Sequence, residues 1–194
     1  TILTPEEYKL FAEAYLIPEG GNFEGRIHLI RRNGSALEGI EKKLLERRRE
    51  RAQPFIDKKF VTSRNCLAGI ALIQAYRYLG VAGAFQKAEA LFKTLIKRHY
   101  VPGKLAHSSC GGKVEEDGFL QDSAAMLLFL TYLHVDAGHY EEEINDFYAM
   151  TLSFKKDGVW MESCQSDFLP VPADHFDHPV PSGVSLAELG LFRA

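Results

Sequence analysis

The sequence predicts an all-α protein made of stacked antiparallel helical hairpins, and three observations support this prediction. Residues 65–79 and 123–135 are apolar on almost every side, which is typical of helices that are buried on most sides. Each of these segments is followed, after a short break, by a helix with a single apolar face. The glycines at the two breaks, Gly80 and Gly138, are 138 − 80 = 58 residues apart, so the same pair of helices occurs twice.

The first 34 residues are predicted to form a helix and a linker. Thr4 is placed to cap a helix that starts with Pro5 and ends near Leu16. Glycines recur through residues 18–34, which predicts a loop with a short extended stretch at 27–30.

A second helix is predicted from Ser35, as its N-cap, to about Ala52. The basic run at 47–49 suggests a phosphate-binding site. However, Glu46 and Glu50 flank this run, so a solvated and salt-bridged helix face is the better interpretation.

The amphipathic member of each hairpin is predicted to be the outer helix, and the apolar member the inner one. In residues 84–100 and 140–154 the apolar positions follow a spacing of three and four, with charged residues elsewhere. The apolar faces consist of Phe85, Ala88, Leu91, Phe92, Leu95 and Ile96 in the first segment and Ile144, Phe147, Tyr148 and Thr151 in the second. The segment 184–194 is predicted to begin a third inner helix.

The links alternate in length, and this predicts where a site would lie. The links within hairpins are short, whereas those between hairpins, 100–119 and 155–183, are long and rich in glycine and proline. Antiparallel packing places both long links and the N-termini of the inner helices at one end, which we name the long-link rim. Helix N-termini offer free N–H groups and partial positive charge, and long loops on a rigid scaffold commonly carry binding residues.

Composition excludes several classes of function. The 194 residues carry a formal net charge of -3, which argues against a general binder of nucleic acid or anionic membranes. The three cysteines lack metal-binding or disulfide-framework spacing; Cys66 and Cys164 are expected to be packed and Cys110 exposed. No signal peptide or membrane-spanning apolar run is present, so a cytoplasmic, soluble protein is expected.

Four segments resemble, in order and spacing, the YyaL / spermatogenesis-associated thioredoxin-domain family. They are LFAEAYLIPEGGNFEG, FIDKKFVTSRNCLAGIAL, GFLQDSAAMLLFL and DHPVPSGVSLAELGLFRA. The resemblance implies that residues 1–34 follow a thioredoxin-like domain, which this chain lacks. It also implies that residues 35–194 are a partial α/α toroid of the six-hairpin glycosidase type, truncated at its C-terminus. Such toroids are similar to N-acylglucosamine 2-epimerases, so a carbohydrate-related role is implied, with sugar binding, epimerisation or hydrolysis as possibilities.

The chain departs from the family pattern at polar and aromatic positions. The pattern D-D-K-x-L-x-x-W-N-G-L has Lys58, Arg64 and Cys66 in place of an aspartate, the tryptophan and a glycine. In the pattern F-L-D-D-Y-A the first aspartate is Gln121, and in P-S-G-N-S the asparagine is Val184. These departures favour the alternative function, a non-catalytic scaffold or protein-interaction module with a degenerate site.

Three aspartates are the candidate catalytic residues. Asp57, Asp122 and Asp177 all fall near N-termini of predicted inner helices, on the long-link rim. Sugar hydrolysis needs two carboxyl groups that flank the scissile bond, and such a trio could supply them. The alternative is that each aspartate caps its helix.

Candidate binding residues surround these aspartates. Histidine pairs transfer protons in epimerases of this fold. Trp160, with Phe168 and Phe176, could form a stacking platform for a sugar ring, but core packing under a long loop is the favoured interpretation. The candidate binding residues are Lys59, Asn65, His107, Trp160, His178 and Ser182. No metal site and no cofactor are predicted, because residues 174–178 lack further ligands at a recognisable spacing. The expected partners are a carbohydrate or other small molecule, and a second copy bound through exposed inner-helix surface.

Overall fold

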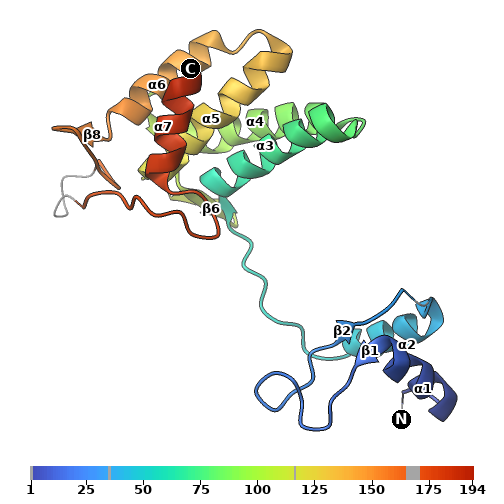
Figure 1. Ribbon diagram of the computed structural model, residues 1–194. Helices are drawn as coiled ribbons and strands as arrows, with labels where there is room; N and C mark the ends of the chain where they lie inside the picture. Colours follow the sequence, from blue (N-terminus) through green and yellow to red (C-terminus); the bar gives the residue numbers. More distant parts are fainter. Residues whose placement is uncertain (1, 35, 116, 165–170) are drawn as a thin grey trace. The chain divides into compact units, whose positions relative to one another are not determined.

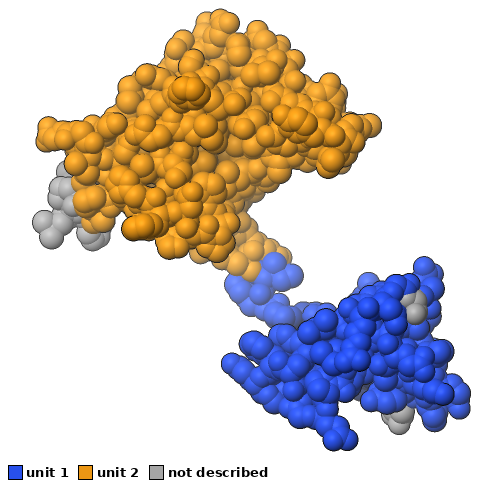
Figure 2. All heavy atoms as spheres, in the orientation of Figure 1, with its two compact units in different colours: residues 1–56 blue, residues 57–194 orange. Residues whose placement is uncertain are grey.

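The computed structural model describes residues 2–34, 36–115, 117–164 and 171–194 (Figure 1). These residues form seven helices and strands of only two or three residues, so the prediction of a mostly helical protein is confirmed. The chain divides into two compact units, Thr1–Ile56 and Asp57–Ala194, which Figure 2 shows in different colours. No helix in the described part of the chain is long and apolar enough to cross a lipid bilayer.

Unit 1 is a pair of helices, α1 (Pro5–Ala14) and α2 (Glu38–Arg49), with a two-stranded ribbon of β1 (Tyr15–Leu16) and β2 (Ile30–Arg31). Thr4 caps α1 as predicted, since its side chain accepts the Glu7 N–H and Glu7 reaches back to the Thr4 N–H. The predicted cap Ser35 lies outside the described residues. Leu3, Phe11, Ala14, Leu37 and Ile40 form the core.

The boundary between the two units lies between residues 56 and 57. The boundary expected from the sequence lay between residues 34 and 35. Leu37 and Ile40 of the second helical segment pack against Phe11 and Ala14 of α1, so burial of these side chains joins α2 to unit 1. The basic run on α2 is exposed, and Arg47 forms an ion pair with Glu50, in keeping with a solvated helix face.

Unit 2 contains the two predicted hairpins. The first consists of α3 (Thr62–Leu79) and α4 (Ala84–His99), and the second of α5 (Leu120–Ala137) and α6 (Glu141–Leu152). The last helix is α7 (Gly183–Arg193). Helix α5 packs against α3, α6 and α7, and α3 packs against α4 (Figure 1).

Glycines in the left-handed region end the inner helices α3 and α5. Gly80 (φ +63°) and Gly138 (φ +72°) are the C-caps of α3 and α5, a conformation that side-chain-bearing residues rarely adopt. The 58-residue repeat therefore corresponds to two helices, α3 and α5, that end in the same way.

The inner helices α3 and α5 differ in burial. Twelve residues of α5 are buried, as an all-round apolar helix predicts. Helix α3 was expected to be equally buried, but only Thr62, Ser63, Cys66, Gly69 and Ile73 are buried, and Tyr78 and Leu79 are each 77% exposed. The reason is that α5 has helices on three sides, whereas within unit 2 α3 packs mainly against α4 and α5.

The long links, predicted to be loops, contain short strands. The first link forms β4 (Tyr100–Val101), β5 (Lys104–Leu105), β6 (Ser108–Cys110) and β7 (Lys113–Glu115), and the second begins with β8 (Lys155–Lys156) and β9 (Val159–Trp160). Strand β6 also pairs with β3 (Phe60–Val61), which directly precedes α3. The turns of these hairpins use Gly103, Gly111, Gly112 and Gly158, all with positive φ.

Candidate functional site

The N-termini of the three inner helices lie together. The Ser63 N–H at the start of α3 donates to Asp122 Oδ1 over 3.0 Å. Gln121 Nε2 of α5 donates to the Pro181 carbonyl, just before α7, over 2.8 Å. At the start of α7, an added Cβ on Gly183 would lie 3.2 Å from the Gln121 nitrogen. These contacts join α3 to α5 and α5 to α7. They lie at the N-terminal ends of the helices, which the alternation of links assigned to the long-link rim.

Asp122 is the most engaged residue at this end of unit 2. Its side chain is buried, with 1% of its surface exposed, and it accepts the N–H of Phe119 over 3.1 Å as well as that of Ser63. Its Oδ2 also lies 2.8 Å from Nδ1 of His107. Asp122 thus caps its own helix and the neighbouring inner helix, and it orients an imidazole.

His107 is the partly exposed member of this pair. Its side chain is 31% exposed, and the hydrogen bond to Asp122 raises the pKa of His107, although burial opposes this effect. Because an ionised carboxylate only accepts hydrogen bonds, Nδ1 of His107 carries a proton. Within the described ranges Nε2 forms no hydrogen bond, so this nitrogen is the one available to a ligand or for proton exchange.

A second histidine nearby is structural. His99 is 3% exposed, and its Nδ1 lies 2.8 Å from the hydroxyl of Thr62, which donates its proton to the Ala106 carbonyl. Nδ1 of His99 must therefore be the donor, and Nε2 accepts from the Ser109 hydroxyl at 2.8 Å. Burial lowers the pKa of His99, so the neutral ring links α4 to α3 and β6.

The two histidines should give opposite pH dependences of stability. The pKa of His107 is raised on folding, so its contribution is present below the unfolded value of about 6.5 and is lost as the pH rises through the folded value. The pKa of His99 is lowered, so its contribution is lost as the pH falls from about 6.5 toward the folded value. In denaturant titrations across this pH range, His107→Gln should therefore remove the loss of stability at rising pH. His99→Gln should remove the loss of stability at falling pH. A shared pH profile for both variants would contradict these assignments.

Glu162 is a further candidate that the sequence pattern did not reveal. Its carbonyl accepts the Leu120 N–H over 3.0 Å, which fixes the second long link to the start of α5. Burial, followed by the negative charges of Asp122 and Asp174, raises the pKa of the half-buried Glu162 carboxyl. No motif marks Glu162; only its place in a long link could have indicated it.

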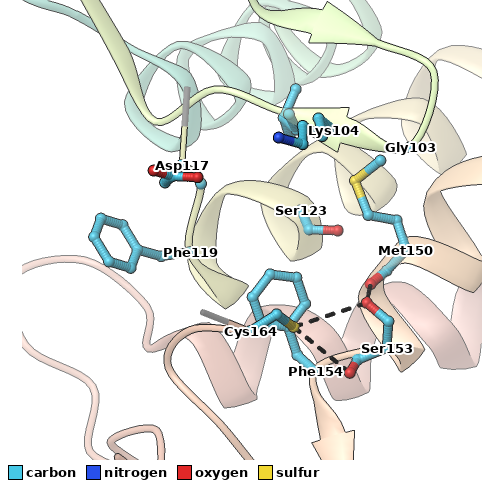
Figure 3. A pocket seen from close by; sticks show the side chains of 11 residues that line it. Gly103, Lys104, Asp117, Phe119, Ser123, Met150, Ser153, Phe154 and Cys164 are labelled. Carbon is cyan, nitrogen blue, oxygen red and sulfur yellow. Dashed lines mark hydrogen bonds between the residues drawn. The ribbon is translucent and has the colours of Figure 1, made fainter. Parts of the chain in front are cut away.

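A cavity of about 260 Å³ lies between the two long links and the adjoining ends of α5 and α6 (Figure 3). Lys104 and Asp117 of the first link lie across it from Ser153, Phe154 and Cys164. Phe119 lines the cavity, and its ring also packs against His107, with 5.0 Å between the two ring centroids. The cavity, which we name the rim cavity, is lined by Gly103, Lys104, Leu105, Asp117, Gly118, Phe119, Ser123, Met150, Ser153, Phe154 and Cys164.

The candidates at the start of α3 each form a hydrogen bond with a nearby residue, and the charge of Lys59 also acts on His107, where it opposes the raised pKa. Asp57 accepts the N–H of Lys59 over 3.0 Å, and the Lys59 ammonium lies 3.5 Å from the same carboxylate. Both side chains are more than half exposed. Asn65 donates from Nδ2 to the Val61 carbonyl over 2.7 Å, within the first turn of its own helix. No contact joins these three residues to Asp122.

The candidates near α7 are also local. Asp177 accepts the Ser182 N–H over 2.9 Å, and this hydrogen bond is the main cause of a lowered pKa for Asp177. The Ser182 hydroxyl in turn accepts the Ser185 N–H over 3.1 Å and so caps α7. His178 is exposed and lies 3.1 Å from Asp174.

Trp160 is packed in the core, which was the favoured of its two interpretations, whereas Cys164 is placed differently from what was expected. Trp160 is 3% exposed, its Nε1–H donates to Glu188, and the Lys155 ammonium lies 4.6 Å from its ring centroid. The indole is therefore packed and offers no open face for sugar stacking, while Phe168 lies outside the described residues. Cys164, expected to be packed, is exposed at the rim cavity.

The other two cysteines lie as expected. Cys66 is buried and Cys110 is exposed. Burial raises the pKa of the Cys66 thiol, which is therefore neutral. Among the described residues, no group of three or more His, Cys, Asp or Glu side chains is placed to hold a metal ion.

Comparisons with known proteins add no relative. No protein-family model and no curated protein matches the chain.

Proposed function

We propose that unit 2 is part of an α/α toroid that binds a carbohydrate at the long-link rim and transfers a proton through His107. The observation that supports this most strongly is the Asp122–His107 pair, with its separation of 2.8 Å and a partly exposed imidazole. A buried carboxylate that fixes the tautomer of a histidine leaves Nε2 as a general base or acid.

Proton transfer of the epimerase type fits this site better than hydrolysis. Hydrolysis requires two carboxyl groups that flank one bond, but Asp57 and Asp177 are exposed and each caps a local turn. An epimerase instead needs a base that removes a proton beside a carbonyl and an acid that returns one. In this proposal Nε2 of His107 exchanges the proton, and the half-buried Glu162, on which the charge of Asp122 acts, is the candidate for the second group.

The rim cavity supplies suitable contacts for a small sugar. Phe119 and Phe154 offer apolar surface, while Lys104, Asp117 and Ser153 can donate to or accept from hydroxyl groups. The volume of about 260 Å³ suits a ligand of monosaccharide size. Phe119 connects the two features, since it lines the cavity and its ring centroid lies 5.0 Å from that of His107.

Binding and turnover can be tested separately with a library of monosaccharides and N-acylated monosaccharides. We expect Lys104→Ala to weaken binding of the best ligand about tenfold, since one hydrogen bond to a charged group contributes about 1.5 kcal/mol. His107→Gln should retain binding but abolish the incorporation of solvent deuterium beside the sugar carbonyl. The matched control is His139→Gln, in the short link that follows α5, which should alter neither measurement. Deuterium incorporation that persists in His107→Gln would overturn the proposed role.

The second candidate is a non-catalytic interaction module. It is favoured by one observation: all three predicted catalytic aspartates accept backbone N–H groups, and so each has a structural role. Under this alternative, none of the sugars binds, and His107→Gln changes only the pH dependence of stability.

A further inference from the structure

We propose that two copies of this chain associate side by side through the groove between the outer helices α4 and α6. The groove has a volume of about 400 Å³. Its lining combines apolar side chains with charged ones and consists of Phe92, Lys93, Ile96, Lys97, Tyr100, Glu143, Asp146 and Phe147. This surface is separate from the rim cavity, with which it shares no residue.

The two walls of the groove carry opposite charge. Lys93 and Lys97 are four residues apart on α4 and are exposed, and Glu143 and Asp146 are three residues apart on α6. The same asymmetry extends over each helix. The charges of α4 sum to +4 − 1 = +3, from Lys87, Lys93, Lys97, Arg98 and Glu89, and those of α6 to −4, from Glu141, Glu142, Glu143 and Asp146.

These charges are unpaired across the groove. Among the described residues, Lys93, Lys97, Glu143 and Asp146 take part in no ion pair. An apolar floor runs between the walls, where Ile96 and Tyr100 are only partly buried. Partly exposed apolar side chains between two charged rows form the usual arrangement of an interface core and its rim.

The second copy is the occupant that this charge pattern fits. In a two-fold dimer whose axis runs along the groove, α4 of each copy faces α6 of the other. The basic wall then meets an acidic wall twice, while the apolar floors meet at the centre. A partner of uniform charge would be repelled by one of the two walls, whereas the chain itself is complementary to both.

A charge-swap experiment tests this pairing. Sedimentation velocity on the full chain should show a monomer–dimer equilibrium with a Kd on the order of 10 µM, as expected for a small interface. The double variants Lys93→Glu/Lys97→Glu and Glu143→Lys/Asp146→Lys should each be monomeric, because like charges then face each other. Mixing the two variants should restore the dimer, since an all-acidic groove meets an all-basic one. Unchanged circular dichroism would show that both variants fold.

The outcomes separate this interface from other modes of self-association. The proposal is supported if the two charge-reversed variants dimerise only when they are mixed, and if added salt weakens the dimer at least tenfold. The control is Phe192→Ser, at a residue of α7 that is 88% exposed on an inner helix, which should leave the dimer unchanged. A monomer at all concentrations overturns the proposal. So does a dimer that tolerates both charge reversals but is abolished by Phe192→Ser, which would place the contact on the inner-helix surface instead.

Discussion

Asp122→Ala should lower the free energy of unfolding of unit 2 by about 2–4 kcal/mol, because it leaves buried donors without an acceptor. The Ser63 N–H, at a residue that is 1% exposed, loses the Asp122 oxygen as its acceptor, and the Phe119 N–H and Nδ1 of His107 lose theirs as well. The measurement is denaturant unfolding followed by the fluorescence of Trp160. This is the single tryptophan of the chain, and it lies in unit 2, so the signal reports unit 2 alone.

Two variants calibrate this loss. Asp177→Ala removes an exposed cap and should therefore cost clearly less than Asp122→Ala. Asp122→Asn keeps one acceptor oxygen but turns an NH₂ group toward one of the donors. Its loss of stability should therefore lie between those of Asp122→Ala and Asp177→Ala. If Asp122→Ala costs no more than Asp177→Ala, the two-helix cap is not a major source of stability.

Gly69→Ala should destabilise unit 2 by about 1–3 kcal/mol through overpacking. A Cβ at Gly69 would lie 2.3 Å from the Phe129 ring, which is fully buried at the contact between α3 and α5. Neither helix can separate freely, because Ser63 is bonded to Asp122 at one end and Arg77 to Asp136 at the other. Phe129 itself packs edge-on against Phe92, so the ring has little room to move.

A double-mutant cycle isolates this contact. Phe129→Leu alone should be destabilising, but in its presence Gly69→Ala should cost less, since the smaller side chain leaves room for the methyl group. Ala71→Gly, at an exposed site of the same helix, should cost about 1 kcal/mol from the backbone alone. Additive effects of the Gly69 and Phe129 changes would show that the steric contact is absent.

The spacing of apolar residues predicted the helices, because burial of one helix face leaves a local, periodic pattern in the sequence. Leu95 and Phe147 are buried on the predicted faces, and Gly80 and Gly138 end the helices that they were expected to end. The domain boundary was not predictable in this way. It depends on Leu37 and Ile40 packing against Phe11, a tertiary contact that leaves no periodic signal.

The site was predicted only in part for the same reason. Asp122 and His107 were both candidates, but their contact depends on the strands β6 and β7, which hold the backbone of His107 by a bond from its N–H to the Glu115 carbonyl. Asp57, Asp177 and Trp160 have the expected residue types, yet local capping or burial occupies their polar groups. Glu162 gains its environment only when the second long link reaches α5.

The bonds that join the inner helices all connect residues about one repeat apart. Ser63 and Asp122 are 59 positions apart, Arg77 and Asp136 are 59 apart, and Gln121 and Pro181 are 60 apart. A ribosome that adds about 5–20 residues per second needs roughly 3–12 s for such a stretch. Ser63 therefore leaves the ribosome several seconds before Asp122 can cap it, so the Ser63 amide stays without this acceptor during that interval.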